Sequence, residues 1–251
     1  MWAAVQNGDA KELAELMRQD PGFNVNMDYG NGWTLLHHAC NGHSRSAVIP
    51  LLLAHPDIDV NGMDEHGRTP FYYACYGSTT CVRELLKDSG VKVNEPDNFG
   101  SPPLWVAATF GHLDIIRWWI ASGREMDLGK PGDVDKTDAI GKAKQRGKTE
   151  VATLLERFKE NPVETRYAVS VELGLLDALA AEMFAMVVFV SDGLLQVNDS
   201  TTPAARFFNC AKSLPLELQM VLCYRVVGSA KEIIHGKDSE AAFKSLAMRL
   251  W

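Results

Sequence analysis

Short apolar runs and polar turns alternate along the first 130 residues with a nearly fixed period. A Val-Asn pair closes each unit and places its asparagine at Asn26, Asn61 and Asn94, at intervals of 35 and 33 residues. The aliphatic doublets Leu51-Leu52 and Leu85-Leu86 precede the second and third pairs. A period of this length indicates stacked repeats, in which each unit buries its apolar face against its neighbours.

A longer phrase opens each full repeat. Its three copies begin Gly32-Trp33-Thr34-Leu35-Leu36-His37, Gly67-Arg68-Thr69-Pro70-Phe71-Tyr72 and Gly100-Ser101-Pro102-Pro103-Leu104-Trp105. The glycines suit a turn, the threonine hydroxyls can cap the following helix, and proline fits a first helical turn. The phrase therefore predicts a turn followed by two antiparallel helices in each repeat.

These repeats closely resemble the ankyrin repeat, and the resemblance implies an all-α solenoid with short β-turn hairpins. Residues 1–161 then form the array: a partial N-terminal cap, three full repeats and a degenerate C-terminal repeat. Residues 162–251 form a C-terminal α-helical region. His37 matches the family's hydrogen-bonding histidine, whereas Tyr72 and Trp105 replace it, so the second and third copies lose or replace that contact. The resemblance further implies a protein partner bound in the concave groove.

The turn tips and first helices of such an array line the concave groove, and several variable positions there carry large aromatic side chains. The candidate partner-binding residues are Tyr29, Trp33, Glu65, His66, Arg68, Tyr76, Asn98, Phe99, Ser101, Thr109 and Phe110. Aromatic side chains are typical interface anchors. The competing interpretation is that Trp33 or Phe99 packs on its neighbouring hairpin; we favour binding.

The period stops after Pro162. Helices are expected at 164–190, 203–212, 215–227 and 239–250. The segment 173–190 is strongly apolar, but Asp177 and Glu182 interrupt it. Each acid near the centre of a bilayer costs ~2.5 kcal/mol or more, so a buried core helix is favoured over a membrane span.

The segment that begins Leu214-Pro215-Leu216-Glu217-Leu218 resembles the opening phrase of F-box-like modules. An ankyrin array followed by such a tail, here from about residue 203, is similar to the arrangement in poxviral ankyrin proteins. The resemblance implies a substrate receptor of a cullin-type ubiquitin ligase that recruits a Skp-type adaptor. Its adaptor-facing residues are Leu214, Pro215, Leu218 and Leu222. The alternative is a helical extension that caps the solenoid.

Composition restricts the remaining classes of function. The net charge of -7 argues against nucleic acid or an anionic membrane as a partner. Five cysteines without CxxC spacing indicate buried thiols in a reducing compartment, so we expect a cytoplasmic or nuclear location. The sequence contains no phosphate-binding loop, nucleophile elbow or zinc motif. We therefore expect no catalysis, no cofactor and no bound metal.

Overall fold

The computed structural model describes residues 1–42, 44–129, 137–191, 203–211, 214, 216–227 and 242. The chain divides into two compact units, Met1–Val169 and Ser170–Trp251. The expected division after residue 161 falls eight residues before this boundary and stays a prediction. Regular structure in the described part of the chain is entirely helical, which confirms the all-α expectation.

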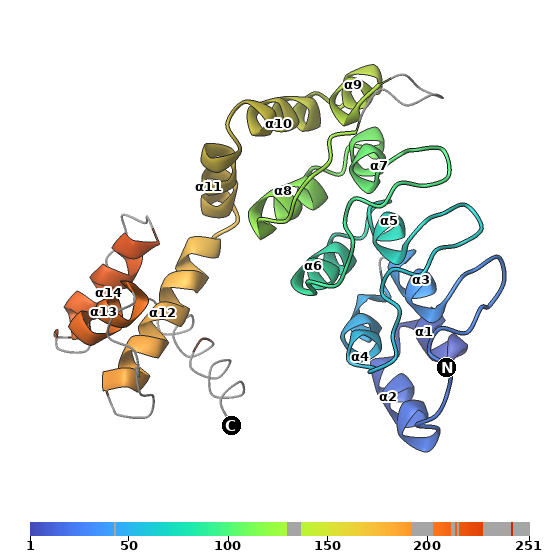
Figure 1. Cartoon of the computed structure of the whole chain (residues 1–251), viewed down its shortest axis with the longest axis horizontal. Coiled ribbons are helices and arrows are strands. Elements are labelled where there is room, and N and C mark those ends of the chain that lie inside the picture. The colour runs from blue at the N-terminus through green and yellow to red at the C-terminus, as the bar shows by residue number, and fades with distance from the viewer. Residues whose placement is uncertain are drawn as a thin grey trace. The chain divides into compact units, whose positions relative to one another are not determined.

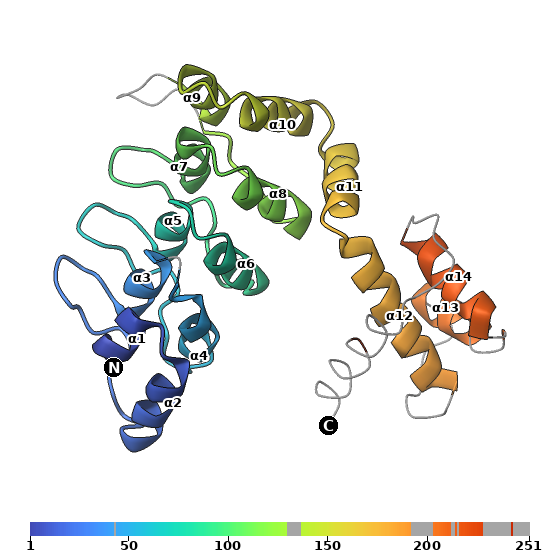
Figure 2. The same ribbon diagram turned by 180° about the vertical axis from the view of Figure 1, so that it is seen from behind.

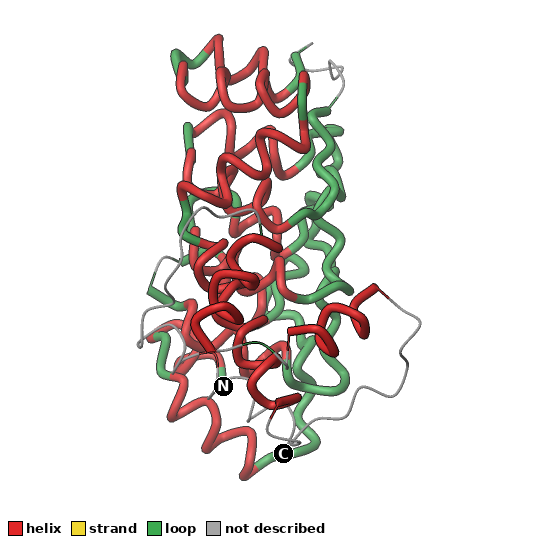
Figure 3. Tube along the Cα trace, turned by 90° about the vertical axis from the view of Figure 1, so that its left-hand side faces the viewer, coloured by secondary structure: helices red, strands yellow, loops and turns green. Residues whose placement is uncertain are grey.

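Paired helices stack in two rows in the first unit (Figure 1 and Figure 2). One row contains α1 (Trp2–Asn7), α3 (Leu35–Cys40), α5 (Pro70–Ala74), α7 (Pro103–Phe110) and α9 (Ala139–Gln145). The other contains α2 (Ala10–Gln19), α4 (Ile49–Leu53) with the short 3-10 helix η1 (Ser46–Val48), α6 (Thr79–Lys87), α8 (Leu113–Ser122) and α10 (Thr149–Glu160). Each helix packs on the next in its row, and the turns between repeats run along one side of the stack (Figure 3).

The opening phrase of each repeat has the local structure that its residue types predict. Gly32, Gly67 and Gly100 have φ angles of 78°, 74° and 78°. A Cβ on Gly32 would lie 2.8 Å from the Cα of Asp64 in the next repeat, so the close approach of neighbouring turns also requires glycine there. At the start of α5, the Thr69 hydroxyl accepts a hydrogen bond of 3.2 Å from the backbone N–H of Tyr72.

The core of the first unit lies between the two rows. Its largest fully buried side chains include Leu35, Leu52, Phe71, Ile116 and Trp119. The rings of Phe71 and Trp119 meet edge to face with their centroids 4.9 Å apart, which ties α5 to α8 across one repeat boundary. Burying a side chain of this size stabilises the fold by ~1.5–3 kcal/mol relative to exposure, so the buried contacts between repeats contribute substantially to the stability.

The asparagine of each closing pair bridges two repeats. The Asn61 side-chain amide donates to the carbonyl of Gly90 at 2.9 Å and accepts from the N–H of Lys92 at 2.7 Å. Asn26 and Asn94 make the same two bonds with their own following loops: Asn26 with Asp57 and Asp59, and Asn94 with Glu125 and Asp127. We call these three residues the asparagine ladder. It satisfies backbone groups that the irregular loops leave without helical partners.

The last part of the first unit closes the stack. Asp138 caps α9 by accepting from the N–H of Gly141 at 2.7 Å, which gives the polar final repeat a regular first helix. α11 (Pro162–Glu172) follows α10 directly, and its Arg166 donates to the carbonyl of Ile120 at 3.1 Å. Thr165 and Val169 of α11 are buried. This half of α11 therefore packs beside the C-terminal end of α8.

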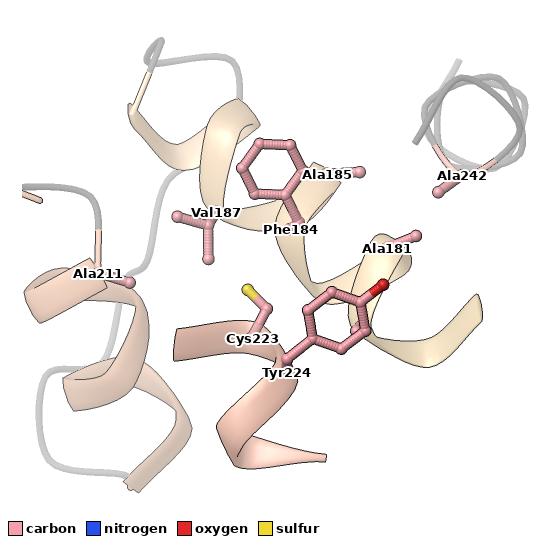
Figure 4. Close-up of a cluster of buried hydrophobic side chains, with 9 residues drawn as sticks. Ala181, Phe184, Ala185, Val187, Ala211, Cys223, Tyr224 and Ala242 are labelled. Atoms are coloured by element: carbon pink, nitrogen blue, oxygen red, sulfur yellow. The ribbon is translucent and has the colours of Figure 1, made fainter. Parts of the chain in front are cut away.

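The second unit has a small apolar core of its own. It contains α12 (Leu175–Ser191), α13 (Pro203–Ala211) and α14 (Leu216–Val226). Phe184 and Val187 of α12 meet Cys223 and Tyr224 of α14 in one buried cluster (Figure 4). The helix expected at 239–250 lies, apart from Ala242, outside the described residues.

The segment expected as one helix at 164–190 is in fact two helices. α11 ends at Glu172 and α12 begins at Leu175, because Gly174 between them adopts a φ of 69° that a continuing helix excludes. Within the described residues no single helix is both long and apolar enough to cross a bilayer, whereas α11 and α12 together pass that test as a bent pair. One face of α12 is buried in the cluster of the second unit, as expected of a core helix.

The asparagine ladder gives a first prediction. Replacing Asn61 with alanine removes two inter-repeat hydrogen bonds, so we expect the free energy of unfolding of the array to fall by about 1–2 kcal/mol. Urea unfolding followed by circular dichroism measures this change. Asn7→Ala, at the exposed end of α1, is the matched control and should leave the unfolding midpoint close to that of the wild type. An equal effect of the two substitutions would contradict the role of the ladder.

Candidate functional site

Buried aspartates fix the tips of the turns. Oδ1 of Asp64 accepts from the backbone N–H groups of His66 and Arg68 at 2.9 and 2.8 Å. Oδ1 of Asp97 does the same for Phe99 and Ser101, both at 3.0 Å. Burial alone would raise the pKa of Asp64, but hydrogen bonds from Tyr73 and from the backbone outweigh it and hold that pKa below its usual value. Both aspartates therefore position the candidate residues of the turns.

A row of aromatic rings runs along the first helices and crosses three repeats. The ring centroid of Trp33 lies 4.5 Å from that of Tyr73 and 5.0 Å from that of His38. The row continues from Tyr73 to Tyr76 at 6.1 Å and from Tyr76 to Phe110 at 5.4 Å. We call these five residues the aromatic row. It joins Trp33, Tyr76 and Phe110 of the predicted site into one surface.

The residues at the histidine position of the phrase each contact the next repeat, by three different chemistries. Nε2 of His37 lies 3.1 Å from the Arg68 carbonyl, the Tyr72 hydroxyl donates to Oδ2 of Asp97 at 2.8 Å, and the Lys142 ammonium lies 4.6 Å from the centroid of the Trp105 ring. We expected copies two and three to lose or replace the histidine contact, and the structure shows that both replace it. All three preserve a contact across the repeat boundary.

The hydrogen bonds of His37 also determine its tautomer. Its Nδ1 accepts from the Thr34 backbone N–H at 3.1 Å, so the proton of the neutral ring resides on Nε2, which donates to the Arg68 carbonyl. Burial lowers the pKa of His37, and the hydrogen bond to Arg68 and the charge of Asp64 oppose this shift only in part. The ring is therefore a neutral structural link.

A hollow of about 440 Å³ lies on the aromatic row between two neighbouring turns. Its lining consists of Asn31, Trp33, Asn41, His66, Arg68, Tyr73 and Tyr76. Four of these residues were predicted; Asn31, Asn41 and Tyr73 were not. Tyr73 occupies the variable position directly after the histidine position, so a comparison of the repeat copies could have identified it as a candidate residue.

The other candidate residues lie around this hollow with different exposures. Phe99 is 57% exposed at a turn tip and Phe110 is 50% exposed at the end of α7, so both rings keep a large surface accessible to a partner. Glu65 and Asn98 are exposed, and the Asn98 amide donates to the Glu65 carbonyl at 3.0 Å.

Four candidates have roles inside the fold or are partly covered. The Thr109 hydroxyl donates to the Trp105 carbonyl at 2.7 Å within α7. Tyr29 is half-buried with its ring edge towards His38, and Ser101 is half-buried. Trp33 is likewise half-buried against Tyr73, so it combines packing with partial exposure.

The cysteine thiols of the first unit are buried. Cys40, Cys75 and Cys81 are at most 1% exposed, and burial raises the pKa of each thiol. A raised pKa keeps a thiol protonated and unreactive. Among the described residues, no group of three or more histidine, cysteine or acidic side chains is arranged to hold a metal ion.

Comparison with known proteins supports the repeat assignment. Residues 1–97 match the family model for ankyrin repeats, in three copies. The chain is 40% identical over 97 residues to the human SMC5-SMC6 complex localization factor protein 1, an alignment that covers 37% of this chain and 9% of the human protein. It is 32% identical over 85 residues to a putative ankyrin repeat protein of Rickettsia bellii, covering 34% of this chain and 47% of that protein.

A third relative aligns over a longer stretch. The target of rapamycin complex 2 subunit AVO2 of Saccharomyces cerevisiae is 24% identical over 180 residues, which are 55% of this chain and 42% of the yeast protein. The alignments thus span less than half the length of each of these relatives. Residues 1–97 match ankyrin repeats, and the helical structure of the described residues agrees with an all-α ankyrin-repeat solenoid.

The lowered pKa of His37 predicts a pH dependence of stability. As the pH falls through 6.5, the ordinary value, the unfolded chain binds the proton before the folded chain does. The contribution of a neutral His37 is therefore complete above that pH and is lost as the pH falls below it. The His37→Gln variant should lose less stability than the wild type between about pH 7.5 and pH 5.

Urea unfolding at the two pH values measures this difference. His38, whose pKa burial also lowers, remains in both proteins and leaves a residual slope of the same sign. Identical pH slopes for the variant and the wild type would show that His37 does not carry the effect.

Proposed function

We propose that the chain is a non-enzymatic interaction protein that binds a protein partner through the surface formed by the aromatic row and the adjoining turn tips. The observation that carries this proposal is the combination of half-exposed rings with the hollow at their centre. Large rings that stay exposed on a rigid surface gain free energy when a partner covers them, and such residues dominate interface energetics. We further propose a cytoplasmic or nuclear location, with no nucleic acid or membrane as a ligand.

The relatives support a role in assembly. One is named as a localization factor of the SMC5-SMC6 complex and another as a subunit of target of rapamycin complex 2. Both names refer to multiprotein complexes. Because the alignments cover only part of each protein, they favour the shared use of the repeats for protein binding and do not identify a partner.

The exposed phenylalanines give the test of this function. The double variant Phe99→Ala and Phe110→Ala should bind the partner more weakly by ~2 kcal/mol or more, because both rings are anchors in this proposal. Incorporating the photoreactive analogue benzoylphenylalanine at position 110 and cross-linking in host cells identifies the partner. Calorimetry with the purified partner then measures the loss of affinity.

Two controls test whether a loss of affinity comes from a folding defect or from the removal of any exposed apolar side chain. Both rings are about half exposed, so the thermal midpoint of the double variant should stay close to that of the wild type. Val163→Ala, at an exposed position on α11, is the matched control for removal of a surface apolar side chain and should leave the affinity unchanged. Absence of any cross-linked protein, or full affinity of the double variant, would refute binding through this surface.

A second candidate function is that of a substrate receptor of a cullin-type ubiquitin ligase, with α14 bound to a Skp-type adaptor. The feature that favours it is the exposure of Leu216 and Leu218, at 53% and 51%, near the start of α14. Leu214 is half-buried, and Pro215 lies outside the described residues. Leu222 packs against the cluster of the second unit, so it is less accessible than Leu218 although the two are one helical turn apart.

The different exposures of the two leucines make this candidate testable. Leu218→Asp should leave the helical signal and the unfolding midpoint nearly unchanged, whereas Leu222→Asp should destabilise the second unit because it buries an unpaired charge. If the adaptor binds α14, Leu218→Asp abolishes copurification of a Skp-type adaptor from host cells. Failure of the wild-type protein to copurify any such adaptor would eliminate this candidate.

A further inference from the structure

Arg68 is the charged residue of the hollow. The other six lining residues are two asparagines, two tyrosines, a tryptophan and a histidine, so no carboxylate lines the hollow. Residues 33, 68 and 101 occupy equivalent positions in successive repeats and are tryptophan, arginine and serine. The fixed positive charge is therefore specific to the middle turn.

The Arg68 guanidinium has partners within the fold but keeps an unused hydrogen-bond donor. It lies 5.6 Å from the centroid of the Tyr72 ring, and Tyr73 and the Asp64 carboxylate interact with its charge. The Arg68 Nε lies 3.9 Å from Oδ2 of Asp97 and is buried without a hydrogen-bond partner. The Asp97 carboxylate already accepts three shorter hydrogen bonds, from the N–H groups of Phe99 and Ser101 and from the Tyr72 hydroxyl. The Arg68 side chain is 24% exposed and lines the hollow, so it can be reached from there, yet it is shielded enough from water for a charge-assisted bond to be strengthened.

The surroundings select the kind of group that can bind there. The Trp33, Tyr73 and Tyr76 rings offer apolar walls for an aliphatic stem, and Asn31 and Asn41 supply amide donors. Rings alone would also attract a lysine or arginine, but Arg68 repels a second cation. A phosphate group carries close to two negative charges and is usually held by several arginines, whereas this hollow has one. The chemistry therefore matches a single carboxylate.

The aromatic row extends beyond the hollow in both directions, to His38 on one side and to Phe110 on the other. A bound polypeptide can thus continue past the hollow instead of ending in it. We infer that the hollow receives an aspartate or glutamate side chain from within the partner polypeptide, with Arg68 as its charged anchor. This inference rests on the protein-binding function proposed above and assigns the chemistry of one contact.

The test uses four small probes on the full-length protein. They are the N-acetyl N-methylamides of glutamate, glutamine and lysine, together with N-acetylglycine, which carries only a terminal carboxylate. Nuclear magnetic resonance follows the indole N–H of Trp33 and the guanidinium Nε–H of Arg68, assigned with Trp33→Phe and Arg68→Lys. We expect the glutamate probe to shift both signals saturably and the other three probes to shift them less.

Two variants show whether Arg68 carries the interaction. With the Trp33 signal as reporter, Arg68→Gln should weaken binding of the glutamate probe about tenfold or more. Arg83→Gln is the matched control, because the Arg83 guanidinium stacks on Trp118 at 4.0 Å and does not line the hollow. It should leave the probe affinity unchanged. Arg68→Gln also removes the ion pair with Asp97 and the contact with the Tyr72 ring, so its thermal midpoint is measured first and the probe affinities are compared at a temperature where both proteins are folded.

Four results would overturn the inference: no shift with any probe, equal binding of glutamine, preferential binding of lysine, or stronger binding of N-acetylglycine than of glutamate. Failure here is distinguishable from failure of the proposed function. A partner that cross-links at position 110 and binds Arg68→Gln with full affinity would refute the carboxylate contact alone. Binding through the aromatic row would then stand, because it is measured with the variants of Phe99 and Phe110.

Discussion

Irregular backbone between the stacked helices needs hydrogen-bond partners, and polar side chains at repeated positions supply them. The asparagine ladder binds the loop of the next repeat through both an acceptor and a donor, and the buried aspartates hold the turn tips from within. An unpaired buried backbone group costs free energy comparable to a lost hydrogen bond. The period of the array is therefore set as strictly by these polar residues as by the leucines of the core.

This constraint also explains how the array ends. Asp127 follows Asn94 by one period, and its carboxylate accepts from the N–H of Gly129 within its own loop. One period later, Asn161 caps the next helix, since its Oδ1 accepts from the N–H of Glu164 and its amide donates to the carboxylate of that residue. Asn161, at the closing position of the last repeat, thus binds the start of α11 and not the loop of a following repeat. The stack stops where this side chain no longer has a following loop to bind.

The repeats could be predicted from the sequence because the cap and the turn of each copy depend on residues that lie close together in the chain. Thr69 caps a helix and Gly67 forms a turn wherever such a phrase occurs, so these features could be derived from single copies. The break at Gly174 was missed because an isolated glycine inside an apolar run does not by itself reveal its φ angle. The site was predicted in part for a related reason. Tyr73 and Asn31 line the hollow only because two neighbouring turns are stacked. The spacing between these turns is a property of the assembled array and cannot be read from one copy of the repeat.

The main chain and the side chain of residue 68 have separate tasks, and this separation bears on how such a surface can change its partner. The Arg68 N–H donates to Asp64 and its carbonyl accepts from His37, so the backbone is held by neighbours whatever side chain it carries. Tyr73 differs, because its hydroxyl donates to Oδ2 of Asp64 at 2.5 Å while its ring lines the hollow. Burial and that bond raise the pKa of Tyr73 to about 12, so the hydroxyl stays a donor at neutral pH. Substitutions at residue 68 can therefore alter recognition without removing these main-chain hydrogen bonds, whereas substitutions at Tyr73 remove a structural hydrogen bond and change the hollow together.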